Sequence, residues 1–110
     1  MEKDVMEKVY DLVEIARSTG KIKKGANEVT KSIERSEAKL VVIAEDTQPP
    51  EILMHFEPLC KERDITLVKV PSKKELGTSA GLEVPCSAIA VIDAGEAKDL
   101  LMEVRGKKKE

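Results

Sequence analysis

Apolar positions follow a helical period at the start of the chain and form short unbroken runs further along. Spacings of three and four residues over 3–19 predict an amphipathic helix that Gly20 ends. Turn and capping signals predict further helices over 27–36, from the Pro49-Pro50 pair to about Arg63, from the capping-box spacing at 72–75 to Gly81, and over 95–104. Apolar runs predict strands at 40–44, 66–70 and 88–92, and 21–24 is a short extended piece.

Helices and strands alternate in this pattern, which is typical of a three-layer α/β/α sandwich. We expect its sheet to be mixed, with about four strands. A chain of 110 residues can bury one core without disulfides or metals, so residues 1–105 are expected to form a single domain. Residues 106–110 are expected to be a basic, disordered tail.

The charge is unevenly distributed along the chain. The formal net charge is −2, yet residues 17–35 carry a net +4, whereas residues 1–16 carry −3 and residues 36–105 carry −5. One basic window in an otherwise acidic chain favours a local, selective contact with an anion over diffuse attraction to nucleic acid.

Missing signals exclude several classes of protein. The first residues are charged, unlike a signal peptide, and the longest apolar run, 40–44, is far too short to cross a bilayer, so we expect a cytoplasmic protein with no membrane partner. Cys60 and Cys86 lack CxxC spacing and His55 has no second ligand nearby, which predicts buried, reduced thiols and no metal or cofactor. There is no phosphate-binding glycine loop and no nucleophile elbow. His55 is expected to be a half-buried helix residue, and the chain is not expected to be an enzyme.

The segment from Gly25 to Lys31 is the strongest candidate for chemistry. It opens a helix whose first amides lack intrahelical partners, and the positive end of the helix dipole suits a phosphate. Glu28 would repel a phosphate but could accept hydrogen bonds from a guanine, and Asn27 beside it can donate and accept. Asn27 and Lys31 lie one turn apart on the same face. A structural alternative stays open, in which Asn27 caps the helix and Glu28 complements its dipole.

The loop Leu82-Glu83-Val84 is a second candidate. It follows a predicted helix and precedes Pro85 and a buried strand, so its apolar side chains either fold back into the core or cover an unstacked base. Lys73 and Lys74, one helix earlier, could touch the same nucleic-acid backbone. The chain has one Tyr, one Phe and no Trp, which excludes a platform that stacks several bases on aromatic rings.

Four separated segments resemble the archaeal large-subunit ribosomal protein L-seven-A-e family, kink-turn RNA-binding proteins whose relatives include a fifteen-point-five-kilodalton nucleolar protein. The segments are KIKKGANEVTK at 21–31, LVVIAEDTQPPEI at 40–52, VPSKKELG at 70–77 and GLEVP at 81–85. They occur in register over about residues 5–105, which makes the set much more specific than any one motif.

The resemblance implies an α/β/α sandwich that binds kink-turns and kink-loops, in which two sheared G·A pairs follow a bulge. It also implies that Asn27 and Glu28 contact the two guanines. Lys23, Lys24 and Lys31 would hold the RNA backbone, with the Gly25 amide close to it. Ile52 and the Leu82-Glu83-Val84 loop would line the place of the extruded base, and Lys73 would meet a nearby phosphate. Many eukaryotic relatives have Glu where this chain has Gln48, so the contact of that side chain stays open.

The implied complexes are the large ribosomal subunit, the box C/D and H/ACA guide ribonucleoproteins, and ribonuclease P. The implied partners are kink-turns and kink-loops in ribosomal RNA, guide RNAs and ribonuclease P RNA, together with guide-complex scaffold proteins, and the free protein is expected to be a monomer. Two alternatives belong to other classes. One is an interaction module of the ribosome that has lost selective RNA binding, and the other is a small-ligand or nucleotide-dependent enzyme on the same fold.

Overall fold

The computed structural model describes the backbone of residues 2–46 and 51–109 and the side chains of residues 7–46 and 54–104. The elements are, in chain order, α1 (Glu2–Thr19), β1 (Lys21–Lys24), α2 (Ala26–Glu34), β2 (Leu40–Ala44), α3 (Glu51–Glu62), β3 (Thr66–Val70), α4 (Lys73–Ser79), β4 (Ala88–Asp93), the short 3-10 helix η1 (Gly95–Ala97) and α5 (Lys98–Lys109). Helices and strands alternate in the predicted order; the three extended segments expected over 21–24, 40–44 and 66–70 have the predicted bounds, and most helix bounds shift by one or two residues.

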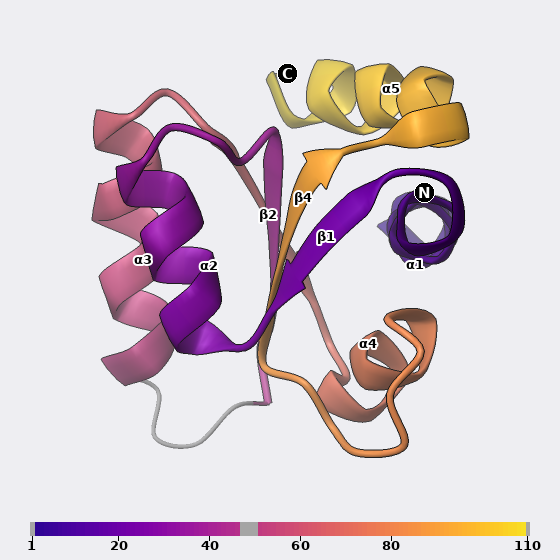
Figure 1. Ribbon diagram of the computed structural model, residues 1–110, viewed down its shortest axis with the longest axis horizontal. Coiled ribbons are helices and arrows are strands. Elements are labelled where there is room, and N and C mark those ends of the chain that lie inside the picture. The colour runs from indigo at the N-terminus through magenta and orange to yellow at the C-terminus, as the bar shows by residue number, and fades with distance from the viewer. Residues whose placement is uncertain (1, 47–50, 110) are drawn as a thin grey trace.

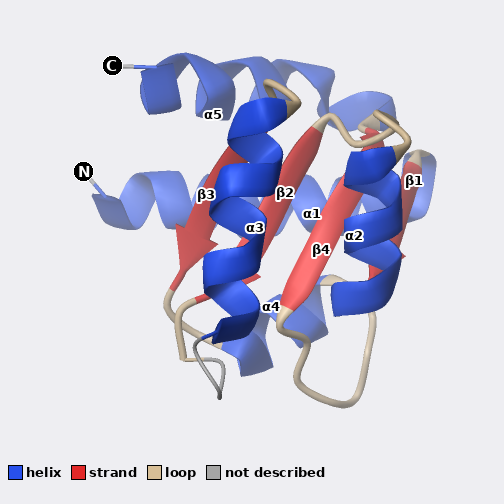
Figure 2. Cartoon of the chain, turned by 90° about the vertical axis from the view of Figure 1, so that its left-hand side faces the viewer, coloured by secondary structure: helices blue, strands red, loops and turns tan. Residues whose placement is uncertain are grey.

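The strands form one mixed sheet in the order β1-β4-β2-β3, with helices on both faces (Figure 1). Helices α2 and α3 cover the face that Figure 2 turns toward the viewer, and α1, α4 and α5 cover the other face. β2 and β3 are parallel, and β4 is antiparallel to both of its neighbours, β1 and β2. The prediction of a three-layer α/β/α sandwich with a mixed sheet is confirmed.

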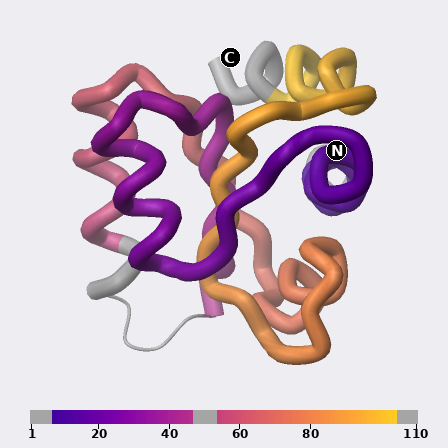
Figure 3. The backbone as a smooth tube through the Cα atoms, viewed as in Figure 1, coloured from indigo at the N-terminus to yellow at the C-terminus, as the bar shows by residue number. Residues whose placement is uncertain are grey.

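The last strand of the sequence lies in the middle of the sheet. Figure 3 follows the chain from α1 through β1 to α2 on the opposite face, and β4 later inserts between β1 and β2. Because β4 has helices on both of its faces, its side chains alternate between two cores. Ile89 and Val91 join one core, and Ala88 and Ala90 join the other.

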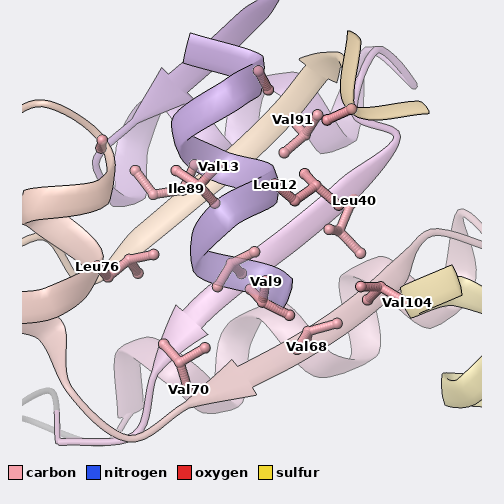
Figure 4. Close-up of a cluster of buried hydrophobic side chains, with 14 of the residues drawn as sticks. Val9, Leu12, Val13, Leu40, Val68, Val70, Leu76, Ile89, Val91 and Val104 are labelled. Atoms are coloured by element: carbon pink, nitrogen blue, oxygen red, sulfur yellow. The ribbon is translucent and has the colours of Figure 1, made fainter. Parts of the chain in front are cut away.

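Two apolar cores flank the sheet. The larger one packs α1, α4 and α5 against the sheet, and it contains the inward positions of the predicted first helix: Val9, Leu12, Val13 and Ala16 (Figure 4). The smaller one packs α2 and α3 through Val29, Ile33 and Phe56, all fully buried. Val29 and Ile33 stand four residues apart, so α2 turns one apolar stripe inward and leaves its opposite face to solvent.

The C-terminal helical region is longer than predicted. The helix expected over 95–104 is present as η1 followed by α5, which continues through Lys109. Residues 106–109 of the predicted tail are therefore helical. Lysine is a good helix former, and positive charge near a helix C-terminus interacts favourably with the helix dipole, which accounts for the extension.

Candidate nucleic-acid interface

The carboxyl ends of β1, β2 and β3 lie at one edge of the sheet, the lower edge in Figure 1, together with the start of β4. The start of α2, the helix α4 and the loop 80–87 all lie along this edge. Open α/β sheets typically bind ligands outside the carboxyl ends of their strands. The topology thus brings together two sequence candidates, 25–31 and 82–84, that are far apart in the chain.

Gly25 turns the chain from β1 into α2. Its φ of +95° is a conformation that L side chains rarely adopt, and a Cβ there would meet no atom within 4 Å. Its amide donates a hydrogen bond to the Ala88 carbonyl at 3.0 Å, which holds the start of α2 against β4. The amides without intrahelical partners are the next three, because Val29 is the first to donate back into the helix.

Asn27, Glu28 and Lys31 have exposed side chains, and none has a hydrogen bond or ion pair to another described residue. Gly25 occupies the N-cap position of α2 without a side-chain capping bond, so Asn27 is not the cap that the structural alternative required. Asn27 and Lys31 line an open groove of about 590 Å³ between α2 and α3, as expected for residues one turn apart.

Five lysines supply positive charge around this edge. Ion pairs within the described side chains join Lys8 to Glu103, Arg63 to Glu62 and Lys69 to Glu57. The ammonium groups of five other lysines are therefore not neutralised by a described carboxylate: Lys23, Lys24, Lys31, Lys73 and Lys74. Lys23 is partly buried and Lys24 is exposed. As neighbours in β1 they leave the strand on opposite faces, so they are placed to meet different phosphates.

In the loop after α4, one apolar side chain folds back onto the core and the other stays exposed, so each of the two alternatives from the sequence holds for one residue. Leu82 is half-buried and packs against the larger core, whereas Glu83 is exposed and Val84 is 61% exposed. Gly77 of α4 lets the loop pack closely, because a Cβ at that position would collide with the Val84 carbonyl oxygen. Leu82 therefore anchors the loop, and Val84 is its free apolar side chain.

The segment 84–88 joins the separate parts of this edge through the backbone. The bonds run from the Cys86 amide to the Lys73 carbonyl at 3.0 Å, from the Ala44 amide to the Ser87 carbonyl at 2.9 Å, and from the Gly25 amide to the Ala88 carbonyl at 3.0 Å. One short stretch of chain thereby fixes α4, the end of β2 and the start of α2 relative to one another.

The start of α4 is fixed by side chains as well. The Ser72 hydroxyl accepts a hydrogen bond from the Glu75 amide at 3.2 Å, which confirms the predicted cap. Tyr10 of α1 packs beside this helix, and burial, followed by the negative charge of Glu75, raises the pKa of its hydroxyl. Asp46 accepts a bond from the Lys73 amide at 2.9 Å. No local sequence pattern links Asp46 to Lys73, because the two residues are 27 positions apart.

Some predicted residues lie outside the described side chains. The expected contacts of Gln48 and Ile52 lie outside them. Cys60 and Cys86 are free and buried, as predicted, and burial raises the pKa of the Cys60 thiol to about 11. His55 is on a helix, as expected, but it is exposed, with its ring 5.5 Å from that of Phe56.

No group of three or more His, Cys, Asp or Glu among the described residues could hold a metal ion. Nor does any described helix combine the length and apolar character needed to cross a membrane.

Fold and edge together define an α/β/α sandwich that gathers amide, acidic, basic and apolar side chains at one end of its sheet. The chain belongs to the ribosomal protein L7Ae/L30e/S12e/Gadd45 family, whose model matches residues 7–101, and the resemblance of its four segments to such proteins is confirmed. Among solved structures it is similar to the Giardia lamblia 15.5kD RNA binding protein, with 30% identity, a TM-score of 0.91 and coverage of 96% of this chain and 88% of that one. Both the family and this neighbour are non-enzymes, which confirms that prediction for this chain.

Proposed function

We propose that this chain binds kink-turn and kink-loop RNA with tandem sheared G·A pairs and performs no catalysis. The family match and the RNA-binding neighbour support RNA as the ligand. The observation that carries the finer proposal is the start of α2, where Asn27 and Glu28 are exposed and have no partner among the described residues. Neither side chain forms a hydrogen bond or ion pair with another described residue, so both are available to a ligand.

The chemistry of these side chains fits guanine edges presented by a distorted helix. A carboxylate accepts from the amino and imino groups of guanine, and an amide can donate and accept beside it. A regular A-form helix hides its base edges in a narrow major groove, whereas a kinked, bulged helix exposes them. The unpaired lysines then hold the phosphate backbone, and Val84 covers apolar surface of an extruded nucleotide.

A protein that reads local RNA shape can serve several assemblies. We propose that it acts in the cytoplasm as a component of the large ribosomal subunit, of box C/D and H/ACA guide ribonucleoproteins and of ribonuclease P, with guide-complex scaffold proteins as further partners. The exposed guanine-contacting pair argues against an interaction module without selective binding, since such a module would not need it.

A mobility-shift assay tests the proposal. The RNAs are a kink-turn, a kink-loop, a straight duplex of equal length, and the kink-turn with its G·A pairs replaced by Watson–Crick pairs. Two guanine contacts of about 1–3 kcal/mol each predict at least about thirtyfold tighter binding of the kink-turn than of the duplex. Equal affinity for all four RNAs would show that binding is nonspecific and would contradict the proposal.

A further inference from the structure

The carboxylate of Asp46 forms a backbone contact that the proposed RNA binding does not account for. It follows β2, and its Oδ1 accepts a hydrogen bond from the Lys73 amide, 27 residues further along, at 2.9 Å. The amide belongs to the first residue of α4, where the helix dipole favours a negative group. Asp46 is itself exposed, so burial of the carboxylate does not explain the contact.

The backbone of Lys73 forms two hydrogen bonds to distant parts of the chain. Its amide donates to Asp46, and its carbonyl accepts from the Cys86 amide at 3.0 Å. The loop that carries Leu82 and Val84 is pinned to the same helix, because the Leu82 amide donates to the Gly77 carbonyl at 2.9 Å. A chain of contacts thus runs from the end of β2 through Lys73 to the loop.

We propose that Asp46 is a positioning residue for RNA binding: it holds the start of α4, and with it Lys73 and the Leu82–Val84 loop, at the distance from the end of β2 that the extruded nucleotide requires. The inference rests on the proposed function. Asp46 acts through the Lys73 amide and does not touch the RNA. A carboxylate beside phosphates would weaken binding by repulsion, so its benefit must come from geometry.

Ser72 offers a matched control within the same helix start. Its hydroxyl also accepts an amide hydrogen bond from α4, but it lies on the segment that leads into α4 and ties the helix only to itself. Ser72→Ala should therefore destabilise α4 much as Asp46→Ala does, while leaving the helix attached to the end of β2. Asp46→Asn keeps an acceptor oxygen and removes the charge.

The experiment measures kink-turn affinity and melting temperature for wild type and these three variants. Hydrogen bonds to charged groups correspond to roughly tenfold to hundredfold in an equilibrium constant, and only part of this reaches the RNA. We expect Asp46→Ala to bind about five- to twentyfold more weakly, and Asp46→Asn and Ser72→Ala to stay within about threefold of wild type. Equal losses for Asp46→Ala and Ser72→Ala, or no rescue by Asp46→Asn, would overturn the inference.

Two further measurements separate positioning from folding. On a kink-turn whose extruded nucleotide is abasic, the deficit of Asp46→Ala should shrink to about twofold or less, because the loop then has no base to cover. In wild type, the Lys73 amide should stay protected from hydrogen exchange when the RNA binds, and faster exchange in the complex would contradict the inference even if Asp46→Ala does not fold. If wild type fails to distinguish the kink-turn from the duplex, the proposed function falls, and this inference falls with it.

Discussion

At the scale of single residues, adjacent positions of α2 have opposite roles. Val29 is fully buried in the smaller core, whereas the side chain of Glu28, one position earlier, is exposed and has no partner among the described residues. Ser32 is buried and donates to the Glu28 carbonyl at 3.0 Å, so the backbone at Glu28 is held while its side chain stays free. The helix fixes the direction of a side chain that contributes little to its stability.

Glu28→Ala should weaken kink-turn binding by ~1–3 kcal/mol, the usual range for losing a good base contact, and should barely change the melting temperature. Glu14→Ala is the matched control, because it removes the same charge from an exposed position of α1, which covers the opposite face of the sheet (Figure 1). It should bind as well as wild type or slightly better. Unchanged affinity for Glu28→Ala, measured by titration calorimetry, would leave Glu28 as a partner of the helix dipole only.

Substitutions of Val84 and Leu82 measure two roles of their loop separately: the proposed contact with RNA and packing on the core. A kink-loop lacks the outer stem, so its binding must rely more on contacts near the bulge. Val84→Ser should weaken kink-loop binding by about 1 kcal/mol, more than kink-turn binding, without lowering the melting temperature, because Val84 is 61% exposed. Leu82→Ser should lower the melting temperature, since Leu82 packs on the core. Equal losses on both RNAs for Val84→Ser would show that the loop gives only general support.

At the scale of elements, α4 and the loop 80–87 behave as one unit. The loop lies against the helix at Gly77, where there is no room for a side chain. Before the chain enters β4, the Cys86 amide of the loop donates a hydrogen bond to the Lys73 carbonyl of the helix. The apolar loop side chain and the Lys73 ammonium group are thereby carried by the same unit. Its packing should affect RNA affinity even where no changed atom touches RNA.

Gly77→Ala tests this coupling. The added methyl would collide with the Val84 carbonyl oxygen, so the loop must shift, at a cost of about 1–3 kcal/mol in unfolding free energy. RNA affinity should fall as well, because Val84 moves. Thr78→Ala, at the exposed neighbouring position, should change the unfolding free energy by no more than about 0.5 kcal/mol and leave affinity unchanged. Denaturant titration and filter binding measure the two effects, and a destabilised Gly77→Ala with wild-type affinity would contradict the coupling.

The sequence predicts elements well here because their signals are local. The unbroken apolar run of β2 and the four-residue spacing of Val29 and Ile33 each determine one element directly. What joins the elements is not local. No pattern in the sequence relates Asp46 to the Lys73 amide, or Gly25 to the Ala88 carbonyl. These contacts depend on strand order, so the candidate side chains could be predicted from the sequence, but not the use of the Gly25 amide or the role of Asp46.

At the scale of the whole molecule, one positive window over residues 17–35 lies in a sequence whose net charge is −2. That net charge repels RNA weakly overall, and the five lysines that no described carboxylate neutralises lie on β1, α2 and α4. Electrostatic attraction should therefore make only a modest contribution to the binding free energy, and selectivity should come from the other contacts.

The salt dependence of affinity measures that contribution. Each neutralised phosphate contributes a log-log slope of about −0.9 in duplex DNA and less in single strands, so five lysines predict a slope no steeper than about −4.5. Lys24→Gln should make it shallower by about one, whereas Lys69→Gln should not, because Lys69 is paired with Glu57 at 2.7 Å. A slope that corresponds to eight or more phosphates would mean that nonspecific attraction dominates.

The central place of β4 also governs when binding competence arises during synthesis. A ribosome releases the chain from its amino end, so the segment 21–31 leaves the exit tunnel long before β4 does. Until β4 arrives, β1 has no strand partner and the Gly25 amide lacks its acceptor, the Ala88 carbonyl. The nascent chain therefore carries its recognition residues on an unfinished sheet. The edge proposed to contact RNA becomes defined only after β4 has left the exit tunnel, because the start of α2 is held through β4.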